Sequence, residues 1–133
     1  MDALLTPDQF AARVVGLPWR KWRADFDACD CYGLVVLWHR HVVGRELGPV
    51  PQTDIATGFS RADGWFECRP EAGATCWMAW RDGAPTHCGV LLAGDVMLHA
   101  EGSAERAGSV RVSSLRFIQR IYGDVRFYRH QPC

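Results

Sequence analysis

The chain has almost no lysine, no net charge and no long hydrophobic run. Lys21 is the only lysine among 15 basic residues, and 15 acidic residues balance them, so the formal net charge is zero. A neutral chain gives no electrostatic reason to bind nucleic acid or an anionic membrane. No stretch approaches the roughly 20 apolar residues of a membrane-spanning helix. We therefore expect neither a nucleic-acid partner nor a membrane segment.

The N-terminus lacks the basic region and the long apolar stretch of a secretory leader. We therefore expect synthesis and folding in a reducing cytoplasm. There most of the six cysteines should stay thiols, although their even number would also suit a disulfide framework. They are residues 29, 31, 68, 76, 88 and 133.

The spacing of a zinc site is also missing. The sequence has no Cys-x-x-Cys pair, and His39 and His41 lie two apart rather than four. Four ligands converge on zinc only from spacings of that kind. A metal site built on Cys29, Cys31 and the other soft ligands is therefore the weaker interpretation, and we expect no metal and no other cofactor.

What is present is the composition of a globular domain, with 48% apolar and 23% charged residues. A chain of 133 residues predicts one domain, residues 1–133. Thr6, Pro7 and Gln9 predict a capped helix start, and Gly16 ends that helix. A second helix is expected over residues 31–43, capped by Asp30 and stopped by Gly44, and a short third one over residues 54–61.

The second half of the chain changes to strand patterns separated by turn residues. After residues 66–68, strands are expected over 75–80, 86–92, 96–100 and 110–113, with a turn over residues 82–85. A helix over 115–122, capped by Ser113 or Ser114, precedes a last strand over 125–130. Helices first and an antiparallel sheet afterwards predict an α+β fold, with N-terminal helices packed on the sheet.

Cys31 lies where a loop becomes the second helix. Asp30 caps that helix, and apolar residues from Leu34 to Trp38 allow one helical face to be buried. A thiol at a helix N-terminus lies at the positive end of the helix dipole, beside unpaired backbone N–H groups. Both favour the thiolate, which is the nucleophilic form. Trp19, Trp22 and Phe26 precede it in a loop, where they either line a groove or cover the core.

Two histidines are candidates to accept the proton of Cys31. If a two-residue loop joins the strands expected over residues 86–92 and 96–100, His87 and His99 lie on opposite faces. A three-residue loop, residues 93–95, pairs Leu92 with Val96 and brings the histidines to one face as diagonal neighbours. Cys31, His87 and His99 then form a nucleophile, a base and an orienting group. The alternative is a buried structural cysteine with two hydrogen-bonded histidines.

The sequence resembles the NlpC family of papain-like cell-wall cysteine peptidases, in particular the short versions of tailed bacteriophages and related tail-tip assemblies. Order and spacing agree over nearly the whole chain, and the combination of motifs is more specific than any one of them. The matching segments are Leu17-Pro18-Trp19, Asp30-Cys31-Tyr32-Gly33-Leu34-Val35, His87-Cys88-Gly89-Val90, Leu98-His99-Ala100 and Phe127-Tyr128-Arg129.

The resemblance implies a papain-like fold and a catalytic triad. By position, Cys31 is the nucleophile, His87 the general base and His99 the group that orients His87. The backbone N–H of Cys31 contributes to the oxyanion hole. Trp19 stands where many relatives have a tyrosine that lines the site, and its indole N–H can donate but not accept. Trp19, Asp30 and Tyr32 are therefore the candidates for substrate binding or oxyanion stabilisation.

The resemblance also implies a substrate, the peptide stem of peptidoglycan, usually cut between D-γ-glutamyl and a diamino acid. We expect a cysteine endopeptidase of a phage tail tip, made in the host cytoplasm, with other tail-tip proteins as partners and the periplasmic cell wall as its place of action. The alternatives are a tail-tip or assembly protein that does not need catalysis, and a transferase or amidase using the same thiol. Two departures from the family pattern favour the structural alternative: Trp19, and Gly73-Ala74 where a Gly-Asp pair is common.

Overall fold

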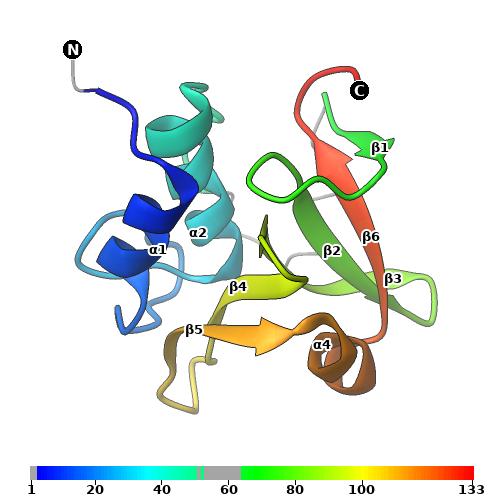
Figure 1. Cartoon of the computed structure of the whole chain (residues 1–133). Helices are drawn as coiled ribbons and strands as arrows, with labels where there is room; N and C mark the ends of the chain where they lie inside the picture. The colour runs from blue at the N-terminus through cyan, green and yellow to red at the C-terminus, as the bar shows by residue number, and fades with distance from the viewer. Residues whose placement is uncertain (1–2, 51, 53–63) are drawn as a thin grey trace.

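An antiparallel sheet of six strands, with a helix against each face, forms the centre of the molecule (Figure 1). This computed structural model describes residues 3–50, 52 and 64–133. The strand order is β1-β6-β2-β3-β4-β5. The strands are β1 (Phe66–Cys68), β2 (Cys76–Arg81), β3 (Ala84–Leu92), β4 (Val96–Glu101), β5 (Ser109–Ser114) and β6 (Asp124–Arg129). The α+β fold class predicted from the sequence is confirmed.

The helices begin where their caps predict. Helix α1 (Pro7–Val14) has a complete capping box, in which Thr6 accepts from the Gln9 backbone N–H and the Gln9 side chain accepts from Thr6. Helix α2 (Cys31–Trp38) continues as a π-helical turn, η1 (His39–Val43), and ends at Gly44 in the left-handed conformation, φ +82°. The short helix expected over residues 54–61 lies outside the described residues.

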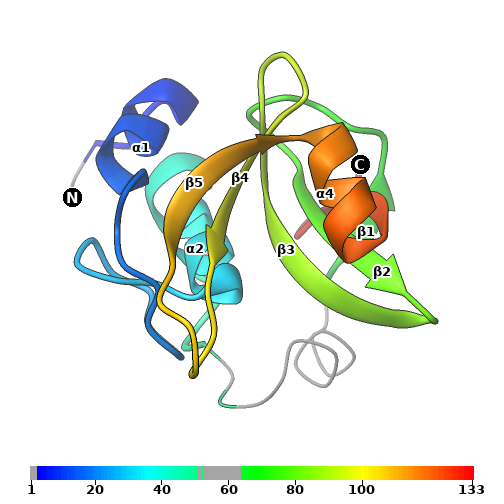
Figure 2. The same ribbon diagram turned by 90° about the horizontal axis from the view of Figure 1, so that it is seen from below.

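Alternate residues of the central strands fill two cores, one on each face of the sheet. The larger core joins α1 and α2 to side chains such as Met78, Val90 and Leu98. The smaller core joins α4 (Leu115–Tyr122) to Trp77 and Met97. Because neighbouring strand residues point to opposite faces, β2, β3 and β4 are apolar at nearly every position. Helix α2 thus covers one face and α4 the other (Figure 2).

Two sequence-based expectations need correction. The turn predicted over residues 82–85 contains only Asp82 and Gly83, both with left-handed φ, and β3 already begins at Ala84. A two-residue hairpin of this kind needs positive φ at both positions, which Gly and Asp tolerate. Cys68 and Cys133 form a disulfide, whereas the other four cysteines are free, as expected for most of them. None of the helices in the described residues is long and apolar enough to cross a membrane.

Candidate active site

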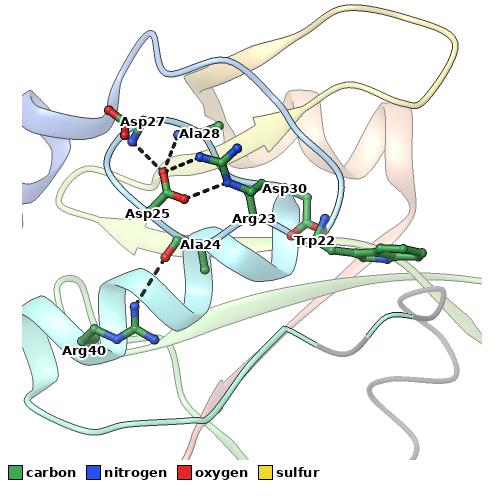
Figure 3. A network of polar contacts seen from close by, with 8 residues as sticks. All are labelled: Trp22, Arg23, Ala24, Asp25, Asp27, Ala28, Asp30 and Arg40. Atoms are coloured by element: carbon green, nitrogen blue, oxygen red, sulfur yellow. Dashed lines mark hydrogen bonds and ion pairs between the residues drawn. The ribbon is translucent and has the colours of Figure 1, made fainter.

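Cys31 is the first residue of α2, and the loop before it is held by many polar contacts. Asp30 caps the helix: one carboxylate oxygen accepts from the Gly33 backbone N–H and the other from the Trp22 backbone N–H, both at 2.7 Å. Earlier in the loop, Asp25 accepts from Arg23 and from two backbone N–H groups (Figure 3). The position of the Cys31 backbone therefore depends on contacts within residues 22–33.

Gly33 allows the loop to lie directly on the first turn of α2. A Cβ atom at this position would collide with the backbone carbonyl of Arg23, whose oxygen accepts from the Asp30 N–H. The Asp-Cys-x-Gly spacing of the sequence therefore has a steric cause. Asp30 provides the cap, and glycine three residues later makes room for the loop.

The two histidines share one face of the sheet because the β3–β4 loop has three residues. Leu92 pairs with Val96, as the three-residue loop predicts. His87 Nε2 and His99 Nδ1 are 2.9 Å apart and hydrogen-bonded, and both residues are buried. Trp77 contacts both imidazoles edge-on, with ring centroids 5.6 Å and 6.1 Å away. The alternative register, with the histidines on opposite faces, is excluded.

The thiol reaches the histidines where β3 and β4 separate. The pairing of these strands ends at Val90 and Leu98, and beyond that point they diverge (Figure 2). A cavity of about 440 Å³ lies there, lined by both Cys31 and His87. Gly89 lets the Leu98 carbonyl and the Trp77 ring lie close to β3, because a Cβ atom at this position would collide with both. The structure thus brings the three residues of the predicted triad together, although their catalytic roles remain predictions.

The surroundings of Cys31 favour its ionised form. Hydrogen bonds from the Cys88 thiol and from His87 hold the pKa of Cys31 well below its usual value, although burial acts in the opposite direction. The backbone N–H of Tyr32 contributes as well. Cys88 is buried in the larger core, as the strand alternation predicts, and burial raises its pKa. Of the two adjacent thiols, Cys31 is therefore the one whose ionisation the surroundings favour.

His99 is kept neutral and is held at both ring nitrogens. Burial, and then the charge of His87, lower the pKa of His99 to about 3. Its Nδ1 contacts His87, and its Nε2 lies 2.9 Å from the hydroxyl oxygen of Ser113 on β5. A neutral histidine with partners at both nitrogens can fix the ring of a neighbouring base.

Tyr122, at the end of α4, covers one face of the His87 imidazole ring. The two rings stack at 4.2 Å with an interplanar angle of 25°. The Tyr122 hydroxyl donates to Glu101 at 2.8 Å, and Arg111 donates to the other carboxylate oxygen of Glu101 at 2.9 Å. Partial burial opposes ionisation of Glu101, but these two hydrogen bonds prevail and lower its pKa. The stack restricts the tilt of the His87 imidazole.

The other predicted site residues lie in different surroundings. Trp19 lines the cavity with Cys31, packs on Gly102 and donates its backbone N–H to Gly108 at 2.9 Å. Both carboxylate oxygens of Asp30 are used within the loop and helix cap. Tyr32 lines a separate small apolar cavity with Cys76 and Cys88. Of these three residues, Trp19 is the one that lines the same cavity as Cys31.

The aromatic residues of the loop before Cys31 divide between the two alternatives of the sequence analysis. Phe26 packs edge-on against Phe10 of α1, and the guanidinium of Arg13 lies 3.6 Å from its ring centre. Trp22 is partly exposed and has a left-handed φ of +62°. Trp19 alone of the three lines the cavity, while Phe26 covers the core.

A comparison with solved structures identifies the fold. The chain superposes on the crystal structure of the NlpC/p60 domain of the peptidoglycan hydrolase SagA with a TM-score of 0.60 and 21% identity, covering 90% of this chain and 92% of that one. The chain has the NlpC/p60 fold. No family model and no curated protein matches the sequence. The predicted papain-like NlpC-type architecture is therefore confirmed at the level of the fold.

Several polar residues around the cavity were missed by the sequence analysis. Ser113 was considered only as a helix cap, a role that Ser114 takes by accepting from the Phe117 N–H. Tyr122, Glu101 and the cavity-lining Arg106 were not singled out. An available signal was the pair Ser113-Ser114, since one helix needs only one cap. The β4–β5 register that brings Ser113 near His99 is a long-range property.

Proposed function

We propose that this protein is a cysteine peptidase that cleaves the peptide stem of peptidoglycan. The observation that carries the proposal is the convergence of Cys31, at the start of α2, with the hydrogen-bonded pair His87–His99 at one cavity. A nucleophile, a base and an orienter are the parts that thiol-dependent acyl transfer needs. The neighbouring structure is a domain of a peptidoglycan hydrolase, which supports the same substrate class.

The proposed reaction has two steps. The Cys31 thiolate attacks the carbonyl carbon of the scissile amide, the C–N bond breaks, and the His87 imidazolium gives its proton to the leaving amine. Water then attacks the thioester, with His87 taking the proton of the water, and the product leaves as a carboxylic acid. His99 holds His87 in position through the hydrogen bond between His87 Nε2 and His99 Nδ1. The tetrahedral intermediate collapses with the Cys31 thiolate as leaving group while His87 keeps the proton of the water, so the initial thiolate–imidazolium pair is restored.

The oxyanion of each tetrahedral intermediate needs hydrogen-bond donors beside the thiol. The backbone N–H of Cys31 is at the first position of α2, where an α-helix leaves its N–H groups without an intrahelical acceptor. The Trp19 side chain lines the same cavity and carries an indole N–H. We assign the backbone of Cys31 the main role and Trp19 a supporting one. Asp30 contributes by orienting the helix, and Tyr32 by its backbone N–H.

We further propose that the peptidase acts at the tail tip of a bacteriophage or a phage-like particle, on the periplasmic cell wall, with other tail-tip proteins as partners. The motif resemblance to short phage domains supports this placement, including the closing strand with Phe127-Tyr128-Arg129. The Cys68–Cys133 disulfide also suits a protein that works outside the reducing cytoplasm in which it is made.

A structural tail-tip protein on the same fold is the second candidate. The observation that favours it is Trp19, which lines the cavity where a residue able to both donate and accept a hydrogen bond is common in this family. In that case the cavity would be retained without essential catalysis. The two candidates predict different behaviour of Cys31 toward peptide substrates.

Cleavage of soluble muropeptides, followed by mass spectrometry, tests the proposal. We expect wild-type protein to release defined stem-peptide fragments and the C31A variant to release none while remaining folded. C29S is the matched control, because Cys29 is buried two residues away and burial raises its pKa to about 12. That variant should keep its activity.

Three results would contradict the proposal. Unchanged cleavage by C31A would exclude Cys31 as the nucleophile. Failure of wild-type protein to cleave any muropeptide, with Cys31 shown to be reactive, would favour the structural candidate. Equal loss of activity in C29S and C31A would point to a paired function of the two thiols.

A further inference from the structure

The hydrogen-bond chain of the site does not end at the third residue of the triad. His99 Nε2 lies 2.9 Å from Ser113 Oγ, so four side chains follow one another: Cys31, His87, His99 and Ser113. Ser113 comes from β5, one of the two edge strands of the sheet, and is half-buried. In the register of β4 and β5, Ser113 is opposite Met97, two residues from His99 on the same face. The contact is therefore a diagonal cross-strand pair.

The direction of the protons along this chain follows from the chemistry of the first pair. In the proposed mechanism, the Cys31 thiolate is paired with a His87 imidazolium, which has a proton on each nitrogen. Its Nε2–H must then be donated to His99 Nδ1, the atom paired with it among the described residues. His99 is neutral, so an accepting Nδ1 requires that its proton is on Nε2. That Nε2–H in turn needs an acceptor, and the Ser113 oxygen is in place to accept it.

His99 is completely buried, so a proton on Nε2 without an acceptor would be costly. Without the Ser113 oxygen, the neutral ring would favour the tautomer with its proton on Nδ1. Such a ring presents an N–H to the N–H of the His87 imidazolium, and the two donors repel each other. The ring does not avoid this repulsion by carrying a proton on both nitrogens, because burial lowers the pKa of His99.

We propose that Ser113 is a positioning residue that selects the Nε2–H tautomer of His99 and thereby stabilises the His87 imidazolium opposite the Cys31 thiolate. The inference rests on the proposed function for its catalytic meaning, but the tautomer itself is a property of the resting protein. Ser114, the adjacent residue, caps α4 instead and accepts from Phe117 N–H at 3.1 Å. The two neighbouring serines therefore have separable roles.

A pair of variants with the same shape isolates the hydroxyl. In S113T the hydroxyl is kept, and in S113V a methyl group replaces it, so the two differ only in the polar atom. A valine also leaves no space for a water molecule to take the place of the oxygen, which an alanine would. S114A is the control for the helix cap. It removes a hydroxyl one residue away without touching His99.

The tautomer is read directly from the nitrogen-15 chemical shifts of the histidine side chains, without any substrate. We expect His99 to carry its proton on Nε2 in wild-type, S113T and S114A protein, and to shift to the Nδ1–H form in S113V. In parallel, we expect alkylation of Cys31 at pH 6 to be roughly tenfold slower in S113V than in S113T. Turnover of a muropeptide should fall in kcat with little change in KM.

An Nδ1–H tautomer of His99 in wild-type protein would overturn the inference, and so would identical tautomers and Cys31 reactivity in S113T and S113V. These results are distinct from failure of the proposed function. If the tautomers behave as expected but no peptide is cleaved, the role of Ser113 stands and the peptidase proposal fails. If C31A abolishes cleavage but S113V equals S113T in every measurement, the peptidase stands and the role of Ser113 fails.

Discussion

At the scale of single residues, the Cys31 thiol differs from every other free thiol of the chain in its surroundings. It accepts hydrogen bonds from Cys88 and His87, whereas Cys29 and Cys76 are buried without such donors, and burial raises the pKa of each to about 12. A thiol reacts through its thiolate, so the fraction ionised decides the rate. The contrast between buried and hydrogen-bonded thiols is therefore measurable within one molecule.

We expect iodoacetamide to label Cys31 rapidly at pH 6, well below the ordinary thiol pKa of about 8.5. Cys29, Cys76 and Cys88 should remain unlabelled in the folded protein, because they are buried. Peptide mapping by mass spectrometry after timed labelling separates the sites. Labelling of Cys31 that begins only near pH 8 would show that the cavity does not stabilise a thiolate.

The C88A substitution removes the donor with the largest influence on Cys31. Hydrogen bonds to charged groups contribute about 1.5–3 kcal/mol, so the pKa of Cys31 should rise and labelling at pH 6 should slow roughly tenfold. C76A is the matched control, since Cys76 is also buried in the larger core but faces Tyr128 rather than Cys31. Equal effects of C88A and C76A would indicate a general loss of packing instead.

At the scale of elements, the π-helical turn after α2 contains a buried histidine. His39 Nδ1 donates to the Val35 carbonyl at 2.8 Å, and burial lowers the pKa of His39 to about 4. The unfolded chain, with a histidine pKa near 6.5, therefore binds a proton between pH 6.5 and 4 that the folded chain does not. His39 contributes stability that is present above pH 6.5 and is lost as the pH falls toward 4.

We expect H39Q to flatten this pH dependence. Over the window from pH 6.5 to 4, one proton corresponds to a slope of about 1.4 kcal/mol per pH unit in the free energy of unfolding. The slope measured for the variant should be smaller than that of wild-type protein by up to this amount. Urea denaturation at several pH values measures it. His99 titrates in the same direction, so part of the slope should remain. An unchanged slope in H39Q would mean that His39 binds its proton equally in both states.

The elements also show which parts of the fold can be predicted from sequence. Caps and breakers are local: Thr6 with Gln9, Asp30 and Gly44 define the helix ends because their hydrogen bonds and φ angles involve only nearby residues. The three-residue β3–β4 loop was one of two alternatives, since both patterns suit Gly94 and Asp95. The contact of Ser113 with His99 could not be predicted, because it depends on how β4 and β5 align across a loop of seven residues, 102–108.

At the scale of the whole molecule, the site depends on the sheet opening between two of its strands. Cys31 belongs to a helix on one face, whereas the His99 side chain shares the opposite face with Met97 of the smaller core. Cys31 meets His87, the partner of His99, at a cavity where the pairing of β3 and β4 has ended beyond Val90 and Leu98. No local pattern encodes this divergence. The sequence predicted Cys31, His87 and His99 from residue chemistry, one of two loop lengths and a family resemblance, but only packing explains how they meet.

The disulfide acts at the same scale, because it ties the edge strand β1 to the end of the chain. Cys68 and Cys133 are separated by 65 residues, and the loop they close contains β2 to β6. Closing a loop of that length restricts the unfolded chain, a stabilisation of about 4 kcal/mol by the chain-entropy relation. Two strands, β6 and β2, separate β1 from β3 and its His87. The bond should therefore affect global stability without changing the chemistry of the cavity.

We expect dithiothreitol to lower the free energy of unfolding of wild-type protein by about 2–4 kcal/mol, and to have no effect on C133S, which should already be destabilised by that amount. At temperatures where both forms are folded, Cys31 labelling at pH 6 should be the same in each. Denaturation with and without reductant, combined with the labelling assay, separates the two effects. Equal sensitivity of C133S to reductant would show that the stabilising bond involves other cysteines. Altered labelling would show that β1 and the C-terminus influence the cavity through the sheet.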